Sequence, residues 1–191
     1  DNVLSDFINK APDQFKDAKY SAERERSVGL GVMGFHSFLQ KKRIPLESVM
    51  AKSWNKKIFK NIHEKVNQAS KDLAEERGAC PDAAEYGFKE RFSNKTAIAP
   101  TASISIICGG ASPGVEPIAA NSYTHKTLSG SFNVRNRYLE EILESHGKND
   151  DETWSTITTN QGSVSHLDFL TDLEKDVFKT AFELNQKWII E

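Results

Sequence analysis

The sequence predicts an α/β fold in which short buried strands are surrounded by amphipathic helices. Two apolar runs, at residues 28–32 and 95–99, are bounded by glycine or proline, as buried strands commonly are. Residues 46–77 instead carry apolar side chains at helical spacing, with lysines and glutamates on the other face. We expect the two short runs to belong to one sheet and the amphipathic stretches to cover it.

The composition argues against a nucleic-acid-binding protein and against a membrane protein. The 191 residues include 25 lysines and arginines against 27 aspartates and glutamates, which gives no sign of nucleic-acid or membrane-surface binding. No apolar run reaches the length of a membrane span. The two cysteines, Cys80 and Cys108, lack the spacing of a zinc site or a redox pair, and such sparse usage fits a reducing cytosol. We therefore expect a soluble, cytoplasmic protein with no metal site in this chain.

Helical patterns dominate the first half of the chain. Apolar side chains follow helical spacing from the start until Pro12 breaks the pattern. The charged run at 21–26 is expected to be a solvated helix end or loop, although one of its arginines could equally bind an anion. The clearest helix, at 46–77, ends where Gly78 follows a charged turn and Pro81 forbids continuation.

Three glycines in the first half have the spacing of a dinucleotide-binding fingerprint. Gly29, Gly31 and Gly34 match it, but charged residues precede them where a strand is required. The acidic residue expected on a second strand about twenty residues later is also missing. We therefore interpret these glycines as sites of close packing. His36 lies in an apolar run, which favours a buried structural histidine over a metal ligand.

The second half begins with a polar segment at 124–132. We expect a loop between elements there, although it could border a site. An amphipathic helix is predicted at 137–145, ended by Gly147, and a charged loop at 148–152. The last helix is expected to open at a capping box over 171–174. Its apolar positions are Leu173, Val177, Phe178, Ala181, Phe182 and Trp188.

No repeat, low-complexity tract or linker-like composition divides the chain. We expect residues 1–191 to form a single segment of one domain. The chain starts without a methionine and stops within a helical pattern, so we expect it to be truncated at both ends.

The stretch at 95–117, KTAIAPTASISIICGGASPGVEP, is the strongest candidate for a site. Pro100 ends the apolar run, because proline cannot donate to a strand ladder. Hydroxyl groups then alternate with Ala102 and Ile104, at Thr101, Ser103 and Ser105. A strand, a hydroxyl-rich turn and a helix start can point free N–H groups at an anion. The pattern indicates a phosphate-binding turn.

Two simpler interpretations stay open on the pattern alone. Thr101 or Ser103 could merely cap a helix. Residues 103–108 could instead form another strand, because the isoleucines favour β-structure.

Five blocks of the sequence, in order, resemble the large (alpha) subunit of class I ribonucleotide reductase. The resemblance covers nearly the whole chain and matches the C-terminal half of that family. The blocks are SAERERSVGLGVMGFHSFLQ, AEERGACPDA, IAPTASISIICGGASPGVEPI, YTHKTLSGSFNVRN and DVFKTAFELNQKWIIE.

The resemblance implies a fold and a function. The family folds as a ten-stranded α/β barrel, of which this chain would supply part of the second half and some outer helices. The family reduces ribonucleoside diphosphates to deoxyribonucleoside diphosphates by radical chemistry, for DNA synthesis. Its substrate-diphosphate turn maps onto Thr101, Ala102, Ser103, Ile104 and Ser105.

The resemblance also implies partners and cofactors outside this segment. The family uses a radical from a metal-containing small (beta) subunit, ATP or deoxynucleotide effectors and a thioredoxin-type reductant, and its alpha subunits form homodimers. Neither Cys80 nor Cys108 falls in a catalytic motif, so we assign no catalytic residue here and expect this chain alone to be inactive. The alternatives are a cobalamin-dependent (class II) reductase fragment and a non-enzymatic, α-rich interaction domain.

Overall fold

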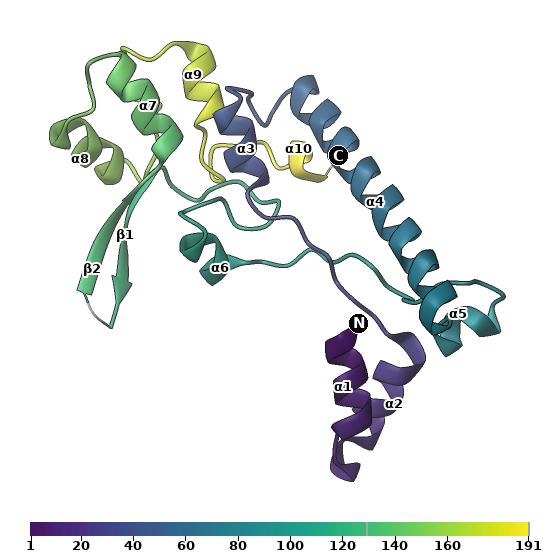
Figure 1. Cartoon of the computed structure of the whole chain (residues 1–191). Helices are drawn as coiled ribbons and strands as arrows, with labels where there is room; N and C mark the ends of the chain where they lie inside the picture. The colour runs from purple at the N-terminus through teal and green to yellow at the C-terminus, as the bar shows by residue number, and fades with distance from the viewer. Residues whose placement is uncertain (129, 191) are drawn as a thin grey trace. The chain divides into compact units, whose positions relative to one another are not determined.

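The computed structural model describes residues 1–128 and 130–190, so Ser129 and Glu191, on which parts of the predictions fell, lie outside it. The chain divides into two compact units, and one of the three boundaries along the chain falls within α4 (Val49–Arg77), which Figure 1 labels. The first unit comprises residues 1–31 and 55–98, and the second comprises 32–54 and 99–191. None of the helices in the described residues is long and apolar enough to cross a membrane.

The first unit consists mainly of helices. They are α1 (Asn2–Lys10), the short 3₁₀ helix η1 (Asp13–Phe15), α2 (Lys16–Glu25), most of α4, and α5 (Pro81–Glu85). Pro12 separates the first two helices as predicted, because its ring cannot continue α1. Gly78 follows α4 with a φ of +85°, a left-handed conformation that glycine adopts without strain, and Pro81 opens α5.

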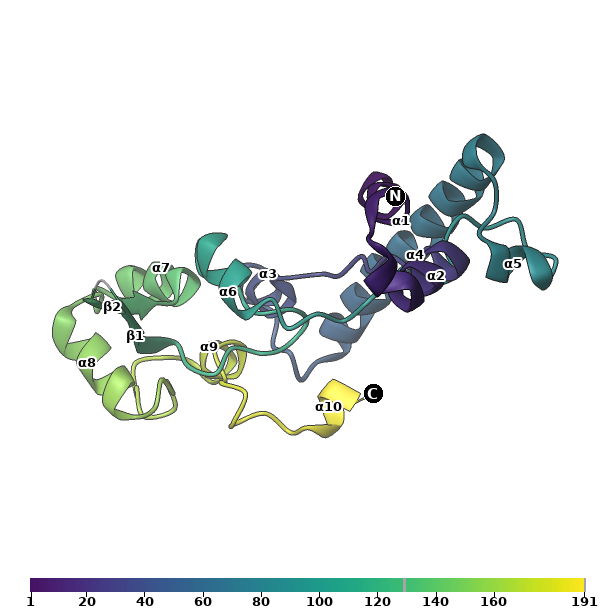
Figure 2. The ribbon, with the colours of Figure 1, turned by 90° about the horizontal axis from the view of Figure 1, so that it is seen from below.

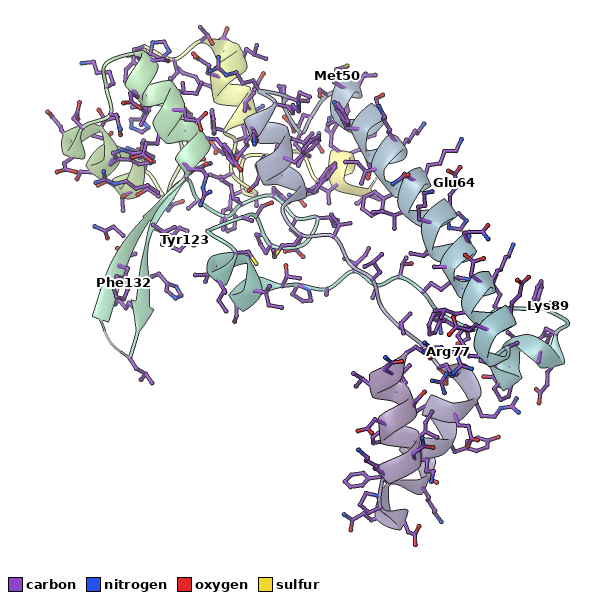
Figure 3. The ribbon with its side chains drawn as sticks, viewed as in Figure 1. Met50, Glu64, Arg77, Lys89, Tyr123 and Phe132 are labelled. Carbon is purple, nitrogen blue, oxygen red and sulfur yellow. The ribbon has the colours of Figure 1, made fainter. Side chains whose placement is uncertain are left out.

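A buried carboxylate ties the helices of the first unit together. The Asp1 carboxylate accepts hydrogen bonds from Arg26 at 2.7 Å, Arg77 at 3.1 Å and Arg91 at 3.2 Å. Figure 3 marks Arg77 at the end of α4. The charged run at 21–26 is the end of α2, as expected, and its Arg26 pairs with a carboxylate of the chain itself.

The two predicted strands of the first unit pair with each other, but only briefly. Leu30 and Thr96 form a single parallel bridge, supported by hydrogen bonds from the Leu30 N–H to the Lys95 carbonyl and from the Ala97 N–H to the Leu30 carbonyl. The pairing confirms that the two apolar runs are neighbours, but the prediction that they are buried is wrong, since Leu30 is 52% and Ile98 is 82% exposed. A β-strand needs several consecutive bridges to its neighbour. These two runs share a single bridge within the described residues, so neither is a full strand.

The second unit contains the remaining elements. They are α3 (Phe35–Lys41), α6 (Ala102–Ile107), β1 (Ser122–Thr127), β2 (Gly130–Arg135), α7 (Arg137–Ser145), α8 (Asp151–Thr159), α9 (Asp172–Val177) and α10 (Lys187–Ile190). The core joins side chains of α7 and α8 to the end of α9, and both views show the hairpin beside α7 and α8 (Figures 1 and 2). Its largest fully buried members are Trp154, Phe178, Leu139, Leu143 and Ile157.

Of three predictions for the second unit, one is wrong and two hold only in part. The segment at 124–132 is not a loop but the greater part of an antiparallel hairpin, in which His125 pairs with Phe132. The predicted charged loop at 148–152 ends in a helix, because the Asp150 side chain accepts the Thr153 N–H and so caps α8. The polar residues of both segments led to the prediction of loops. The Asp150 cap and the hairpin were therefore missed, although each involves residues close together in the sequence.

The predicted last helix is also interrupted. Its capping box is confirmed, since Thr171 and Glu174 exchange both bonds. The helix nevertheless ends at Val177, because the following backbone finds other partners: the Ala181 N–H donates to the Ile118 carbonyl at 2.8 Å. This long-range bond takes the place of a helical one, and a separate short helix, α10, forms later.

Candidate functional site

The start of α6 leaves backbone donors free, as the phosphate-binding interpretation requires. Ala102, Ser103 and Ile104 have no helical carbonyl for their N–H groups, because they occupy the first turn, and all three are exposed. The N–H of Ser105 is the first one satisfied, donating to the Thr101 carbonyl at 2.9 Å. Three adjacent exposed residues therefore have N–H groups without an intrahelical acceptor at the positive end of the helix dipole.

The three predicted hydroxyl groups have different surroundings. Thr101 Oγ1 accepts a hydrogen bond from the Gly114 N–H at 2.7 Å. Ser105 Oγ donates to the Ala102 carbonyl at 2.8 Å, and the residue is 4% exposed. Ser103 is exposed, and its hydroxyl has no protein partner within the described ranges. Ser105 has therefore used its donor within the protein, whereas the Ser103 hydroxyl has no protein partner and Thr101 keeps its O–H donor at the helix start.

The geometry decides between the simpler interpretations of this stretch. Residues 102–107 are helical, so the strand interpretation is wrong. Thr101 occupies the N-cap position, but its backbone is left-handed (φ +50°) and its side chain makes no capping bond. The Thr101 hydroxyl is instead committed to Gly114, which leaves the helix start open.

Long-range contacts that the sequence did not reveal hold the turn after α6 against α3. Ser37 and Ser112 are both buried and exchange two bonds: the Ser112 N–H donates to Ser37 Oγ at 2.8 Å, and the Ser37 N–H donates to Ser112 Oγ at 3.1 Å. His36 is 1% exposed, and its Nδ1 accepts the Ile118 N–H at 3.1 Å. The prediction of a structural histidine is confirmed. No local signal marks the serine pair, because its members lie 75 positions apart.

The glycine motif at residues 29–34 has surroundings that explain its small residues. A Cβ at Gly29 would lie 2.9 Å from the Cβ of Ala97, across the parallel bridge. Gly34 has a φ of +82° and immediately precedes α3. Both positions favour glycine for packing or backbone reasons.

The other candidate ligands do not cluster. Within residues 1–128 and 130–190, no group of three or more His, Cys, Asp or Glu side chains is placed to hold a metal ion. Cys80 is buried and Cys108 is exposed, and both are free thiols.

Comparison with known proteins places the chain in one family. The model of the ribonucleotide reductase barrel domain matches residues 2–91 and 82–191. The ribonucleoside-diphosphate reductase large subunit of Invertebrate iridescent virus 6 is 49% identical over 195 residues, covering 100% of this chain and 20% of the viral protein. The vitamin B12-dependent ribonucleoside-diphosphate reductase of Thermoplasma acidophilum is 32% identical, covering 97% of this chain and 24% of that protein.

A solved structure of a ribonucleotide reductase subunit also matches this chain over nearly its whole length. The class Id ribonucleotide reductase alpha subunit of Actinobacillus ureae superposes with a TM-score of 0.88 at 40% identity. The match covers 98% of this chain and 34% of that subunit. The chain thus spans between a fifth and about a third of the length of these relatives.

Proposed function

The chain belongs to the ribonucleotide reductase barrel-domain family, an α/β barrel fold, and on that premise we propose that it is part of the catalytic large subunit of a class I ribonucleoside-diphosphate reductase. Within the ten-stranded barrel of that family it would supply part of the second half, with surrounding helices. The whole protein would reduce ribonucleoside diphosphates to deoxyribonucleoside diphosphates in the cytoplasm.

The specific role of this segment is to hold the substrate diphosphate at Thr101–Ser105. The observation that carries this proposal is the open start of α6, where Ala102, Ser103 and Ile104 present free N–H groups beside the uncommitted Ser103 hydroxyl. Such donors balance phosphate charge without a lysine. Ser105 would act by fixing the shape of the turn, since its hydroxyl already donates to the Ala102 carbonyl. Thr101 fixes the turn through the bond that it accepts from Gly114, and its own O–H could still donate to a phosphate oxygen.

Holding the diphosphate would orient the ribose for the reaction. Small displacements of a reacting group from its productive geometry cost large factors in rate, so a rigid phosphate anchor contributes to turnover as well as affinity. The Ser37–Ser112 pair and the Thr101–Gly114 bond supply that rigidity. The radical from the small subunit, the nucleotide effectors and the thioredoxin-type reductant would act through residues outside this segment, and a second alpha subunit would complete the dimer.

A cobalamin-dependent reductase is the second candidate function. It is favoured by the Thermoplasma relative, which is named as vitamin B12-dependent and matches 97% of this chain. The higher identities to the iridescent virus subunit and to the Actinobacillus alpha subunit support the class I proposal instead. Dependence of turnover on a small subunit or on cobalamin separates the two.

The proposal is tested by turnover of the complete two-subunit enzyme with an Ala102→Pro substitution. Proline removes one donor and disfavours the left-handed backbone of Thr101 that precedes it, so we expect weaker substrate binding and slower reduction. Ala102→Gly is the matched control, because it keeps the N–H. Circular dichroism checks folding of both variants. Wild-type reduction of nucleotides by a folded Ala102→Pro enzyme would show that the turn serves only to start a helix.

A further inference from the structure

Helix α6 carries the proposed diphosphate turn, yet it buries little of its own surface. Among its residues only Ser105 is buried, and its three isoleucine side chains are between 39% and 82% exposed. A helix of six residues with so little burial depends on the bonds at its two ends to stay in place. The bond between Thr101 and Gly114 fixes its start, so its other end needs an anchor as well.

The C-terminal end of α6 is closed by a double-glycine turn and by one side chain from another helix. Gly109 and Gly110 have φ of +82° and +74°, a left-handed backbone that lets both N–H groups donate to the Ile106 carbonyl. The Gly109 carbonyl in turn accepts a hydrogen bond from Arg137 Nη2. A Cβ at Gly109 would lie 2.8 Å from that nitrogen, so the guanidinium group lies directly against the glycine backbone.

Arg137 is itself anchored to the core of the second unit. It is the first residue of α7, whose Leu139 and Leu143 are fully buried. The N-cap residue before it, Asn136, donates its backbone N–H to the Asn121 carbonyl at 2.9 Å, which fixes the backbone at this point. Arg137 therefore connects a helix of the core to a helix that contributes little to any core.

The charge of Arg137 suits the end of α6 and not the start of α7. A cation in the first turn of a helix lies at the positive end of the dipole, so Arg137 is unfavourable for its own helix. The same cation is favourable beside the carbonyl groups at the C-terminal end of α6. Glu141 lies one turn further along α7, yet Arg137 forms no ion pair with a carboxylate of the described residues. The position of Arg137 is therefore explained by α6.

We propose that Arg137 is a positioning residue for the substrate diphosphate. It holds the C-terminal end of α6, the bond between Thr101 and Gly114 holds the start, and together they set the direction of the free N–H groups. The inference rests on the proposed function and adds to it a residue that does not touch the substrate. At 1.5 Å per residue α6 is about 9 Å long, so Arg137 acts from the end opposite to the phosphates.

The test measures the affinity of the complete enzyme for cytidine diphosphate by calorimetric titration. Arg137→Met removes the donor and the charge, so we expect the dissociation constant to rise about three- to tenfold, part of the effect of one charge-assisted bond. Arg137→Lys keeps a charged donor and should bind at least about twofold more tightly than Arg137→Met. Arg43→Met is the matched control and should bind like the wild type, because the Arg43 side chain is exposed, in the same unit, and has no partner within the described ranges.

A double-mutant cycle separates positioning from a general loss of stability. Ser103→Ala should weaken binding by a factor at least about twofold smaller in the Arg137→Met enzyme than in the wild type, because the donors of α6 are already misaligned there. A role in folding alone would lower the folded fraction, which urea unfolding measures, and would leave the factor for Ser103→Ala unchanged. Arg137→Gln takes the place of Arg137→Met if the methionine variant fails to fold.

Three outcomes overturn the proposal. They are a folded Arg137→Met enzyme that binds cytidine diphosphate like the Arg43→Met control, an Arg137→Lys enzyme that binds no better than Arg137→Met, and an equal effect of Ser103→Ala in both backgrounds. Failure of the proposed function itself looks different, because Ala102→Pro and Ser103→Ala would then also leave the affinity at its wild-type value.

Discussion

Thr101 Oγ1 accepts a hydrogen bond of 2.7 Å from the backbone N–H of Gly114, thirteen positions along the chain. Both residues have left-handed backbones, with φ of +50° and +51°. A Cβ at Gly114 would lie 2.8 Å from the Ala99 carbonyl oxygen, so the two segments are in close contact. The bond therefore fixes the entry to α6 against the turn that follows it, and with it the direction of the free N–H groups.

Removing the acceptor of this bond should destabilise the protein. Thr101→Val keeps the branched shape but leaves the buried Gly114 N–H without a partner, so we expect the free energy of unfolding to fall by about 1–3 kcal/mol. Urea unfolding followed by circular dichroism measures the change. Thr101→Ser retains the hydroxyl and should lose much less. Equal stability of the valine variant and the wild type would mean that the bond contributes nothing.

Two serines of the turn should respond differently to alanine. Ser103→Ala removes the uncommitted hydroxyl and should weaken binding of a ribonucleoside diphosphate by about 0.5–1.5 kcal/mol, or up to about 3 kcal/mol if the partner is a charged oxygen. Ser105→Ala removes a hydroxyl that donates to the Ala102 carbonyl and only supports the shape of the turn, so it should lower affinity less than Ser103→Ala does. Calorimetric titration of the complete enzyme with cytidine diphosphate compares them. Similar losses for both variants would contradict the assignment.

The sequence located this turn but not the role of each of its residues. Pro100, the alternating hydroxyls and the family resemblance together predicted a helix start at Thr101–Ser105, and α6 begins there. The different surroundings of the three hydroxyls depend on partners such as Gly114, which only the folded chain brings close. The Ser37–Ser112 pair was missed for the same reason, because its members lie 75 positions apart.

The position of α7 was predicted correctly from local features of the sequence. The helix at Arg137–Ser145 was predicted with its observed bounds, since its apolar spacing and the following Gly147 are local features. The predicted final helix is wrong beyond Val177, because backbone N–H groups there donate to distant acceptors and not to helical carbonyls. One such bond joins the Asn185 N–H to Glu47 Oε1 at 2.6 Å, and another joins the Ala181 N–H to the Ile118 carbonyl. Neither partner can be identified from helical periodicity.

The glycine motif should affect packing and not dinucleotide binding. Gly29→Ala would place a Cβ 2.9 Å from that of Ala97, so we expect a loss of about 1 kcal/mol, small because both residues are exposed and can shift. Adding Ala97→Gly should restore most of the loss, and urea unfolding of the two single variants and the double variant measures the coupling. Micromolar dinucleotide binding that a folded Gly31→Val variant abolishes would contradict this interpretation.

Burial of His36 should make stability depend on pH. The side chain is 1% exposed, and burial lowers the pKa of the imidazole from 6.5 to about 4. The unfolded chain therefore binds a proton between pH 6.5 and 4 that the folded chain does not. Stability from this group is complete above pH 6.5 and is lost as the pH falls toward 4.

The size of that loss, and its dependence on His36, provide the last test. A pKa lowered from 6.5 to about 4 corresponds to roughly 3 kcal/mol of stability lost across that range. The pKa values of Glu47 and Glu174 are also lowered from 4.5, so their contributions are lost mainly at lower pH, and the slope between pH 6.5 and 5 reports on His36. His36→Asn keeps an acceptor near the position of Nδ1 for the Ile118 N–H and does not titrate. Urea unfolding at several pH values should show a flatter slope for this variant, even if it is less stable at pH 7. An unchanged slope would mean that the histidine is not the group that titrates.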